Sequence, residues 1–286
     1  MTETTAVESP TSTSQTGYAP ANGLQIYYEI HGEDQGGVPV ILLHGAYMVI
    51  PAMEPLLSGL AATRQVIAVE AQAHGRTADI DRPITYEHMA DDTAALIRRL
   101  GLGPVDVVGY SMGAATGLQL VIRHPDLVRK LVPISVSYTS DGMQPALFEM
   151  LPSMSLEMFA GSPMEAAYLE LAPNPGDFGV LVEKLIAHGS TPFAWPDYDI
   201  RGITAPVLVV LGDADVVTIE HAAAMFRLLG GGGMGDLGGF SASRLAILPG
   251  TSHSIPGSGI LDRTPWLLAM IPAFLDEAPP TAPEAP

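Results

Sequence analysis

The sequence predicts an α/β protein with a mainly parallel sheet and helices on both faces of it. Short apolar runs, typical of strands buried on both faces, alternate along the chain with helical patterns. Polar residues suited to catalysis follow three of these runs, in the order serine, aspartate and histidine. The 286 residues are enough for one large domain with a sizeable core or for two small domains.

The first expected strand is an alternating one, and the later ones are continuous apolar runs. Leu24, Ile26, Tyr28 and Ile30 share one face, which predicts a half-buried antiparallel strand. Strands buried on both faces are expected at residues 38–43, 65–69, 105–108, 131–136, 206–211 and 244–248.

Helices are expected between these strands. Thr85 is suited to cap a helix that ends at Gly101 and whose apolar face holds Met89, Leu96 and Leu100. Further helices are expected at residues 114–122, 219–229 and 263–275. Strands that alternate with helices imply crossover connections and parallel pairing.

The rhythm of strands and helices is interrupted once. Residues 137–200 carry many methionine and aromatic residues but no run typical of a buried strand, so we expect a small helical cap there. This cap divides the core into residues 18–136 and 201–276. The glycine-rich stretch 230–239 predicts a mobile loop that bulges away from the active site, because no strand leads into it and no Lys-Ser/Thr pair follows, as a phosphate loop requires.

Both ends of the chain are predicted to be disordered. Residues 1–17 are rich in Ser, Thr and Glu and lack the basic and apolar regions of a signal peptide, so a cytoplasmic location is expected. Residues 277–286 form a tail rich in Pro and Ala. No apolar run reaches the ~18 residues of a membrane span.

Charge and composition narrow the partners. A net charge of −18 disfavours nucleic acids and anionic membranes. The absence of cysteine excludes disulfides, thiolate metal sites and a cysteine nucleophile. We therefore expect a small-molecule substrate, no cofactor, no membrane partner, and a monomer or homodimer.

The stretch from Gly109 to Gly113 is the most informative motif. It reads Gly-Tyr-Ser-Met-Gly and lies between an expected strand and an expected helix. Small residues at both ends let such a turn close tightly and hold Ser111 exposed at a helix N-terminus, as a nucleophile requires. Ser111 is therefore the candidate nucleophile.

A serine nucleophile requires a base and an acid that orients the base. His253 follows the last expected strand and is the candidate base, while Asp213 and Asp215 both follow the strand before it. Asp215 is favoured as the acid, and Asp213 would then structure the turn.

An oxyanion hole requires two backbone N–H donors. Met112, directly after the candidate nucleophile, is the first candidate donor. Ala46 is favoured over Tyr47 as the second, and His44 is expected to brace the loop that carries them.

These motifs together resemble those of the α/β-hydrolase superfamily, over residues 18–276. The resemblance implies a serine esterase-like member with an eight-stranded sheet and a helical cap between strands six and seven. It also implies Ser111 as nucleophile, Asp215 as acid and His253 as base. One segment, Glu70–Thr77, departs from the Asp-x-x-Gly-x-Gly-x-Ser turn that members often carry, and within it His74 and Arg76 are expected to be structural rather than to border the pocket.

Ester hydrolysis through an acyl-enzyme is the expected reaction, because an alkoxide leaving group needs the least assistance. A lactonase, an amidase, a carbon–carbon bond hydrolase, a perhydrolase and a hydrolase-fold ligand receptor remain alternatives. A metal site is disfavoured because the spacing of the candidate ligands matches no metal motif. These ligands are His44, His74, Asp213 and Asp215.

The remaining predictions concern the pocket and the other histidines. An apolar pocket for an acyl or aryl group is expected from Tyr110, Met143, Phe148, Met158 and Phe159. His188 and His221 are predicted to be surface residues, and His124 a helix C-terminal cap.

Overall fold

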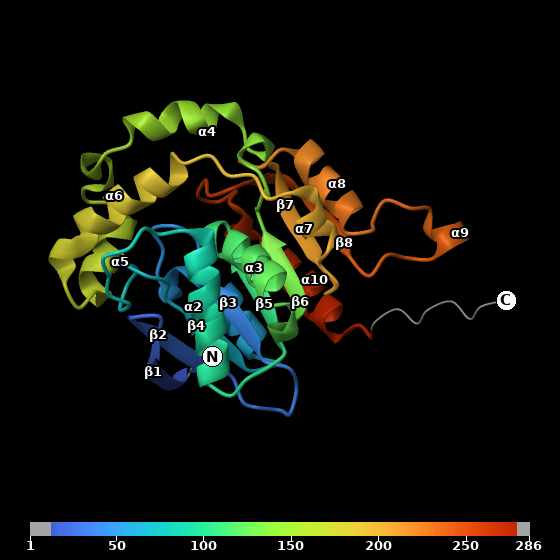
Figure 1. Ribbon diagram of the computed structural model, residues 1–286, viewed down its shortest axis with the longest axis horizontal. Coiled ribbons are helices and arrows are strands. Elements are labelled where there is room, and N and C mark those ends of the chain that lie inside the picture. The colour runs from blue at the N-terminus through green and yellow to red at the C-terminus, as the bar shows by residue number, and fades with distance from the viewer. Residues whose placement is uncertain (1–12, 279–286) are drawn as a thin grey trace, which may run out of the picture.

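The computed structural model describes residues 13–278 and contains one eight-stranded sheet in the order β1-β2-β4-β3-β5-β6-β7-β8 (Figure 1). β2 pairs antiparallel with β1 and β4, and the other pairs are parallel. The expected mainly parallel, eight-stranded sheet is therefore confirmed. Its strands are β1 (Thr13–Ala21), β2 (Leu24–His31), β3 (Val40–Leu43), β4 (Val66–Val69), β5 (Val105–Tyr110), β6 (Val128–Ile134), β7 (Leu208–Ala214) and β8 (Arg244–Ser252).

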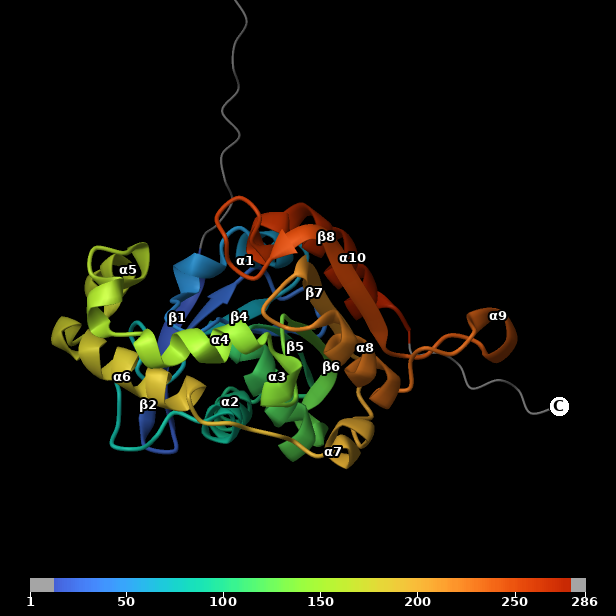
Figure 2. The same ribbon diagram turned by 90° about the horizontal axis from the view of Figure 1, so that it is seen from above.

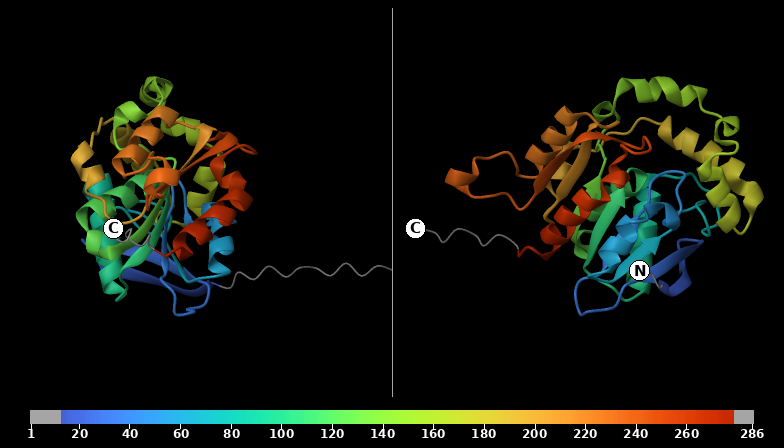
Figure 3. Two further views of the ribbon diagram at one scale, coloured as in Figure 1. Left: turned by 90° about the vertical axis from the view of Figure 1, so that its right-hand side faces the viewer. Right: turned by 180° about the vertical axis from the view of Figure 1, so that it is seen from behind.

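Helices cover both faces of the sheet, because its central strands are apolar on both sides. In β3, Ile41 packs into the core under α2, α3 and α8, whereas Leu42 packs into the core under α1 and α10. Figures 2 and 3 show these two helical layers on either side of the sheet. The five helices are α1 (Leu56–Ala61), α2 (Tyr86–Arg99), α3 (Met112–Arg123), α8 (Ile219–Leu228) and α10 (Thr264–Asp276).

The caps predicted for two helices are confirmed. The Thr85 hydroxyl accepts a hydrogen bond from the His88 N–H (3.1 Å) at the start of α2, and Gly101 takes a φ of +67° just after its end. His124 is the C-cap residue of α3, and its ring lies 2.8 Å from the carboxylate of Asp91.

Both chain ends differ from the prediction where the structure describes them. Residues 13–17 belong to β1 and pair with β2, although their polar composition suggested disorder. An edge strand needs only backbone hydrogen bonds from one neighbour, which explains why its side chains can be polar. The Glu277 carbonyl accepts a hydrogen bond from Lys130 Nζ (2.5 Å), so Glu277 is bound to the core. The predictions for residues 1–12 and 279–286 lie outside the described residues.

The segment between β6 and β7 consists of short helices that arch over the core (Figures 1 and 2). This is the region for which the sequence predicts a helical cap, and no sheet strand lies in it. Its helices are α4 (Pro145–Met150), α5 (Pro163–Leu171), α6 (Phe178–Gly189) and α7 (Asp197–Arg201). Its 3₁₀ turns are η3 (Ser140–Gly142), η4 (Leu151–Ser153), η5 (Leu156–Phe159) and η6 (Pro175–Asp177).

Helix α6 is fastened to the core through Lys184. Its ammonium donates to the Asp79 carboxylate (2.6 Å) and to the carbonyls of Ile80 (2.8 Å) and Arg82 (2.9 Å). The ammonium group of one cap residue is thus bound by three acceptors in a single loop of the core.

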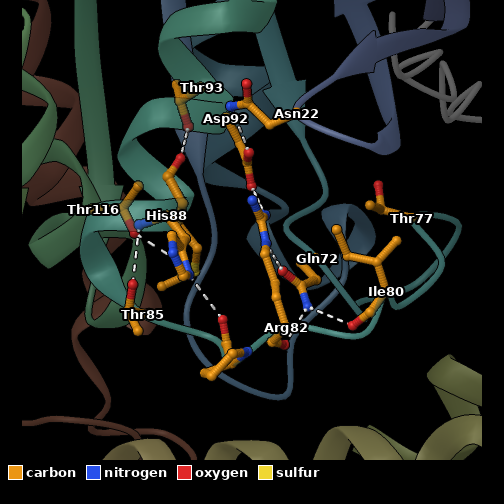
Figure 4. A network of polar contacts seen from close by, with 12 residues as sticks. Asn22, Gln72, Thr77, Ile80, Arg82, Thr85, His88, Asp92, Thr93 and Thr116 are labelled. Carbon is orange, nitrogen blue, oxygen red and sulfur yellow. Dashed lines mark hydrogen bonds and ion pairs between the residues drawn. The ribbon is translucent and has the colours of Figure 1, made fainter.

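A polar network holds the same loop against the core (Figure 4). Gln72 Nε2 donates to the Arg82 carbonyl (3.1 Å), and Arg82 Nε donates back to Gln72 Oε1 (2.7 Å). The Arg82 guanidinium also pairs with Asp92 of α2, and Asp92 accepts a hydrogen bond from Asn22 in the β1–β2 turn (3.0 Å). The base on which the cap rests is therefore tied to two core elements.

The glycine-rich stretch lies in the connection between α8 and β8 and contains the short helix α9 (Gly235–Gly238). The prediction of a loop without any element was wrong for these four residues. In Figures 1 and 3 the connection projects away from the cap. Within residues 13–278, no helix has the length and apolarity that crossing a membrane requires.

Candidate active site

Ser111 lies in the turn between β5 and α3, with φ 54° and ψ −115°. Backbone torsions of this kind are strained for a residue with a side chain and persist only where the surroundings enforce them. A Cβ atom at Gly109 would lie under 3.0 Å from the Gly113 carbonyl, and one at Gly113 would lie as close to the Leu43 carbonyl. Only glycine fits at these two positions, so the spacing of the motif follows from the tightness of the turn.

Three side chains from three loops form one hydrogen-bonded chain. Ser111 Oγ lies 3.0 Å from His253 Nε2, and His253 Nδ1 lies 2.9 Å from Asp215 Oδ1. His253 follows directly after β8, and Asp215 follows directly after β7. The parallel strands β5, β7 and β8 end at one edge of the sheet, which brings together residues that are up to 142 positions apart in the sequence.

Asp215 is buried and fully hydrogen-bonded. Its carboxylate accepts hydrogen bonds from the Ser135 hydroxyl (2.5 Å) and from the backbone N–H groups of Gly212 (3.2 Å) and Val217 (3.4 Å). Burial alone would raise the pKa of Asp215, but the hydrogen bond and charge of His253, together with Ser135 and Gly212, hold that pKa below its usual range. Asp215 is therefore ionised at neutral pH.

Asp213 has a different environment, which separates the two aspartates that the sequence left open. Its carboxylate accepts from the N–H groups of Gly250 (2.9 Å) and Thr251 (3.0 Å) near the end of β8, and it is exposed. Asp213 thus links the ends of β7 and β8, whereas Asp215 is the aspartate that is hydrogen-bonded to His253.

Tyr110 contacts both the ring and the backbone of His253. Its ring stacks on the His253 ring with centroids 5.1 Å apart, and its hydroxyl donates to the His253 carbonyl (2.9 Å). These two contacts fix both the ring and the backbone of His253.

The loop after β3 contains two backbone N–H groups that are candidate oxyanion donors. In the described chain, only one of them already has a hydrogen-bond acceptor. The Tyr47 N–H donates to His74 Nε2 (3.2 Å), and Tyr47 has a φ of +62°. In the described part of the chain, neither the Ala46 N–H nor the Met112 N–H has a protein hydrogen-bond partner. Both residues line the same cavity as Ser111.

His44 and His74 brace this loop as neutral rings. His44 Nδ1 donates to the Gly45 carbonyl (2.8 Å) and its Nε2 accepts from the Ala71 N–H (3.1 Å). His74 Nδ1 donates to the Gln72 carbonyl (2.9 Å). Complete burial lowers the pKa of His44 to about 4 and that of His74 to about 3.

Arg76 also stays within the core side of the loop. Its guanidinium donates to the fully buried Glu70 carboxylate (2.9 Å) and lies over the Tyr27 ring. Among residues 13–278, no three His, Cys, Asp or Glu side chains are grouped so that they could hold a metal ion.

A cavity of about 380 Å³ lies between Ser111 and the cap. Tyr110, Met143 and Phe148, which the sequence proposed for the pocket, line it. No Asp, Glu, Lys or Arg is present among its described lining residues. Lining residues that the sequence interpretation missed include Tyr86, Ser135, Ser137, Met154, Leu185, His188, Phe193 and Val217.

Two residues proposed for the pocket lie elsewhere. Met158 is 60% exposed, and Phe159 is buried against Tyr47 and Phe178, with ring centroids 4.7 and 6.1 Å away. The methionine and aromatic content of the cap predicted an apolar cavity, but it did not show which side chains point into it.

The two histidines predicted to be on the surface are partly buried instead. His221 Nε2 accepts from the Tyr138 N–H (3.1 Å), and its ring stacks on the Tyr138 ring. His188 lines the cavity and packs edge-on against Tyr86 (4.4 Å between centroids). Burial lowers the pKa of both histidines.

Comparison with known proteins supplies a family and several relatives. Residues 40–267 match the model of the alpha/beta hydrolase family. A 2-(acetamidomethylene)succinate hydrolase of Mesorhizobium japonicum is 38% identical over an alignment of 217 residues, and the match covers 67% of this chain and 76% of that protein. RutD of Azorhizobium caulinodans, which bears the name of a carbamate hydrolase, is 30% identical over 133 residues, which are 46% of this chain and 49% of RutD.

The chain thus spans about half the length of the first curated relatives that it matches. Among solved structures, the meta-cleavage product hydrolase of Pseudomonas fluorescens IP01 superposes with a TM-score of 0.69 at 18% identity, covering 92% of this chain and 97% of that chain. This likeness shows a shared fold.

Proposed function

Since the chain belongs to the alpha/beta hydrolase family, we propose that it is a serine hydrolase that cleaves a carboxylic ester through an acyl-enzyme intermediate. The observation that carries the proposal is the hydrogen-bonded chain Ser111–His253–Asp215, with distances of 3.0 and 2.9 Å. A serine hydroxyl is a poor nucleophile until a base within hydrogen-bond reach takes its proton.

In the first half of the reaction, Ser111 Oγ attacks the carbonyl carbon of the ester, and His253 Nε2 takes the hydroxyl proton. Asp215 holds the Nδ1–H of His253 and stabilises the imidazolium that forms, without taking up a proton itself. The ionised state of buried Asp215 supports this role. His253 then gives the proton to the alkoxide as it leaves, and the acyl group stays on Ser111.

The carbonyl oxygen becomes negatively charged in each tetrahedral intermediate. We assign its stabilisation to the backbone N–H groups of Ala46 and Met112, which face no protein acceptor in the described chain. Tyr47 is the weaker candidate because its N–H already donates to His74.

In the second half, water replaces the alcohol in the cavity. His253 takes a proton from this water as its oxygen attacks the acyl carbonyl. The tetrahedral intermediate then collapses, and His253 returns the proton to Ser111 Oγ while the carboxylic acid leaves. The free enzyme is regenerated.

The cavity supports an uncharged and largely apolar substrate. Its volume of about 380 Å³ suits a small molecule, and its described lining carries no Lys or Arg. The relative from M. japonicum is named for a succinate, whose two carboxylates would meet no cation in this cavity. We therefore propose a neutral ester rather than that dianion as the substrate.

The test compares the wild type with Ser111→Ala and His253→Ala on short and medium p-nitrophenyl esters. We expect wild-type turnover above about 1 s⁻¹ and a loss of kcat on the order of 10⁴–10⁶ in each variant. Mass spectrometry of the quenched wild type should detect an acyl group on Ser111. Negligible turnover by a folded wild type, or turnover that survives Ser111→Ala, would contradict the proposal.

Hydrolysis of an amide-type bond is the second candidate. It is favoured by two relatives, one named for carbamate and one for an acetamido compound. Neutral aryl amides and carbamates tested against matched aryl esters decide between the two. A kcat/KM for the amide or carbamate above that for its ester would replace the ester proposal.

A further inference from the structure

Two buried polar atoms in the described chain have no hydrogen-bond partner, and both belong to residues that line the cavity. They are Ser137 Oγ and His188 Nε2. A buried polar atom without a partner destabilises the fold, so a native structure that retains one calls for an explanation. Because the residues that carry these two atoms line one cavity, a molecule bound there is a candidate partner for both atoms.

Ser137 belongs to the wall of the cavity on the sheet side. It lies three residues after the end of β6, and only 1% of its surface is exposed. A hydroxyl both donates and accepts, and water reaches this one poorly from the outside.

His188 lies on helix α6 of the cap, on the side of the cavity opposite Ser137. The backbone carbonyl of Ile84 lies close enough to the His188 ring to oppose, as a hydrogen-bond acceptor, the lowering of its pKa. A carbonyl only accepts, and Nε2 has no partner, so the nitrogen facing Ile84 is Nδ1 and carries the hydrogen. Burial lowers the pKa of His188, which keeps the ring neutral at pH 7. Nε2 therefore carries a lone pair that no donor in the described chain occupies.

We propose that His188 Nε2 and Ser137 Oγ form a polar subsite that binds an uncharged O–H or N–H group of the substrate, at a distance from the scissile ester. His188 accepts the hydrogen of this group, and Ser137 pairs with a polar atom of the same substrate. The inference rests on the proposed function, since the subsite is placed in the proposed acyl-transfer cavity. A carboxylate is a poor occupant, because a neutral imidazole offers it a lone pair and the described lining holds no cation.

The neighbouring rings favour an aryl group that carries this polar substituent. Tyr86 packs edge-on against the His188 ring, and Phe193 packs edge-on against Tyr86 (5.3 Å between centroids). Both aromatic residues line the cavity. A flat ring lying against them can carry its hydroxyl or amide to His188.

The kinetic test uses methyl 3-phenylpropanoate and its derivatives with a hydroxyl or an acetamido group at ring position 3 or 4. We expect one substituted isomer to have a kcat/KM about tenfold or more above the parent ester in the wild type. His188→Leu should abolish this preference and Ser137→Ala should reduce it, where the preference is the ratio of kcat/KM for the substituted ester to kcat/KM for the parent ester in the same variant. The hydroxyl and acetamido series show which of the two donors is preferred.

His88→Leu is the matched control. His88 is another helical histidine whose ring donates to a backbone carbonyl, that of Pro83 (3.0 Å), but it is not among the residues lining the cavity. Its replacement should leave the preference unchanged. Equal preference in the wild type, His188→Leu and Ser137→Ala, or no preference for any isomer in the wild type, would overturn the proposal.

A binding measurement separates failure of the subsite from failure of the esterase. The Ser111→Ala protein is titrated with p-cresol, N-methylbenzamide and toluene, and binding is followed by NMR. The subsite predicts that the phenol or the amide binds about tenfold more tightly than toluene and that adding His188→Leu removes the difference. If this holds while the wild type hydrolyses no ester, the subsite stands and the ester proposal fails. If toluene binds as tightly as both polar probes, the subsite proposal fails whatever the turnover.

Discussion

Ser135 is the residue through which β6 acts on the candidate site. It follows the last residue of β6 with a φ of +59°, and its hydroxyl donates to Asp215 Oδ2 at 2.5 Å. Its N–H donates to the Val210 carbonyl (2.7 Å), which fixes its position against β7. We infer that Ser135 is a positioning residue that holds the carboxylate aligned with His253.

Replacing Ser135 with alanine or glycine tests this role. Both changes remove a hydrogen bond to a charged group, so kcat/KM on an activated ester should fall about tenfold in each. Glycine also relieves the positive φ and should give a free energy of unfolding about 1 kcal/mol above that of the alanine variant. Kinetics and urea unfolding are measured on both proteins. An activity loss that follows stability instead of the missing hydroxyl would leave Ser135 a purely structural role.

The sequence predicted Ser111 and His253 more readily than Ser135 for a physical reason. Each of those two follows an apolar run and has a distinctive neighbourhood, such as the two glycines around Ser111. Ser135 falls inside the stretch 131–136, which was predicted to be strand, but β6 ends at Ile134. Nothing in the composition of that stretch signals a serine with a positive φ.

At the scale of an element, the loop after β4 carries unusual strain. Ala73 has a φ of +64° and is buried, at a position where the resembling family often has glycine. The turn nevertheless persists, because the Thr77 hydroxyl donates to the Glu70 carbonyl (2.8 Å) and the Thr77 N–H to the His74 carbonyl (3.0 Å). The surrounding hydrogen bonds enforce a conformation that alanine disfavours.

Ala73→Gly should therefore stabilise the protein. Relief of the left-handed conformation is worth about 1 kcal/mol, which thermal or urea unfolding can measure. Ala71→Gly is the matched control in the same loop. Ala71 has no positive φ, so its replacement should lower the free energy of unfolding by roughly 0.5–1 kcal/mol. If Ala73→Gly lowers the free energy of unfolding, the backbone of Ala73 is not strained.

The cap shows the limit of sequence patterns at this scale. The lack of an apolar, strand-like run predicts a helical segment, and helices occupy it. Met158 and Phe159 lie in the four-residue turn η5, which is too short for an apolar stripe to orient its side chains. Met158 is exposed to solvent, and the Phe159 ring packs against the Tyr47 ring. Orientation in such a segment depends on contacts with the core, which no local pattern encodes.

At the scale of the whole molecule, buried neutral histidines couple the fold to pH. The pKa of His44 is about 4 and that of His74 about 3, below the ordinary histidine value of about 6.5. Above that value both the folded and the unfolded states hold neutral rings, and the full stability is present. As the pH falls below it, only the unfolded state takes up protons, so stability is lost down to about pH 4 for His44 and about pH 3 for His74.

We expect the free energy of unfolding to fall steeply between pH 6 and pH 4.5, by roughly 1.4 kcal/mol per pH unit for each of these two histidines. Urea unfolding of the wild type and of His74→Asn at several pH values measures it. Asparagine does not titrate in this range, so the variant should lose stability less steeply, by about 1.4 kcal/mol per unit. Parallel curves for the two proteins would show that His74 is not part of the coupling.

The two lysines of the chain, Lys130 and Lys184, hold distant segments together, and this has a consequence for protein chemistry. Lys184 fastens the cap, while Lys130 Nζ donates to the carbonyls of Phe274 (2.7 Å), Leu275 (3.1 Å) and Glu277 (2.5 Å) at the end of α10. Amine-acylating labels attack a free, deprotonated amine, and each of these ammonium groups is occupied by three acceptors. Acylation of either lysine therefore requires that its segment first detach. The rate of labelling at Lys184 therefore reports how fast the cap opens. The rate of labelling at Lys130 reports how fast α10 detaches from the core.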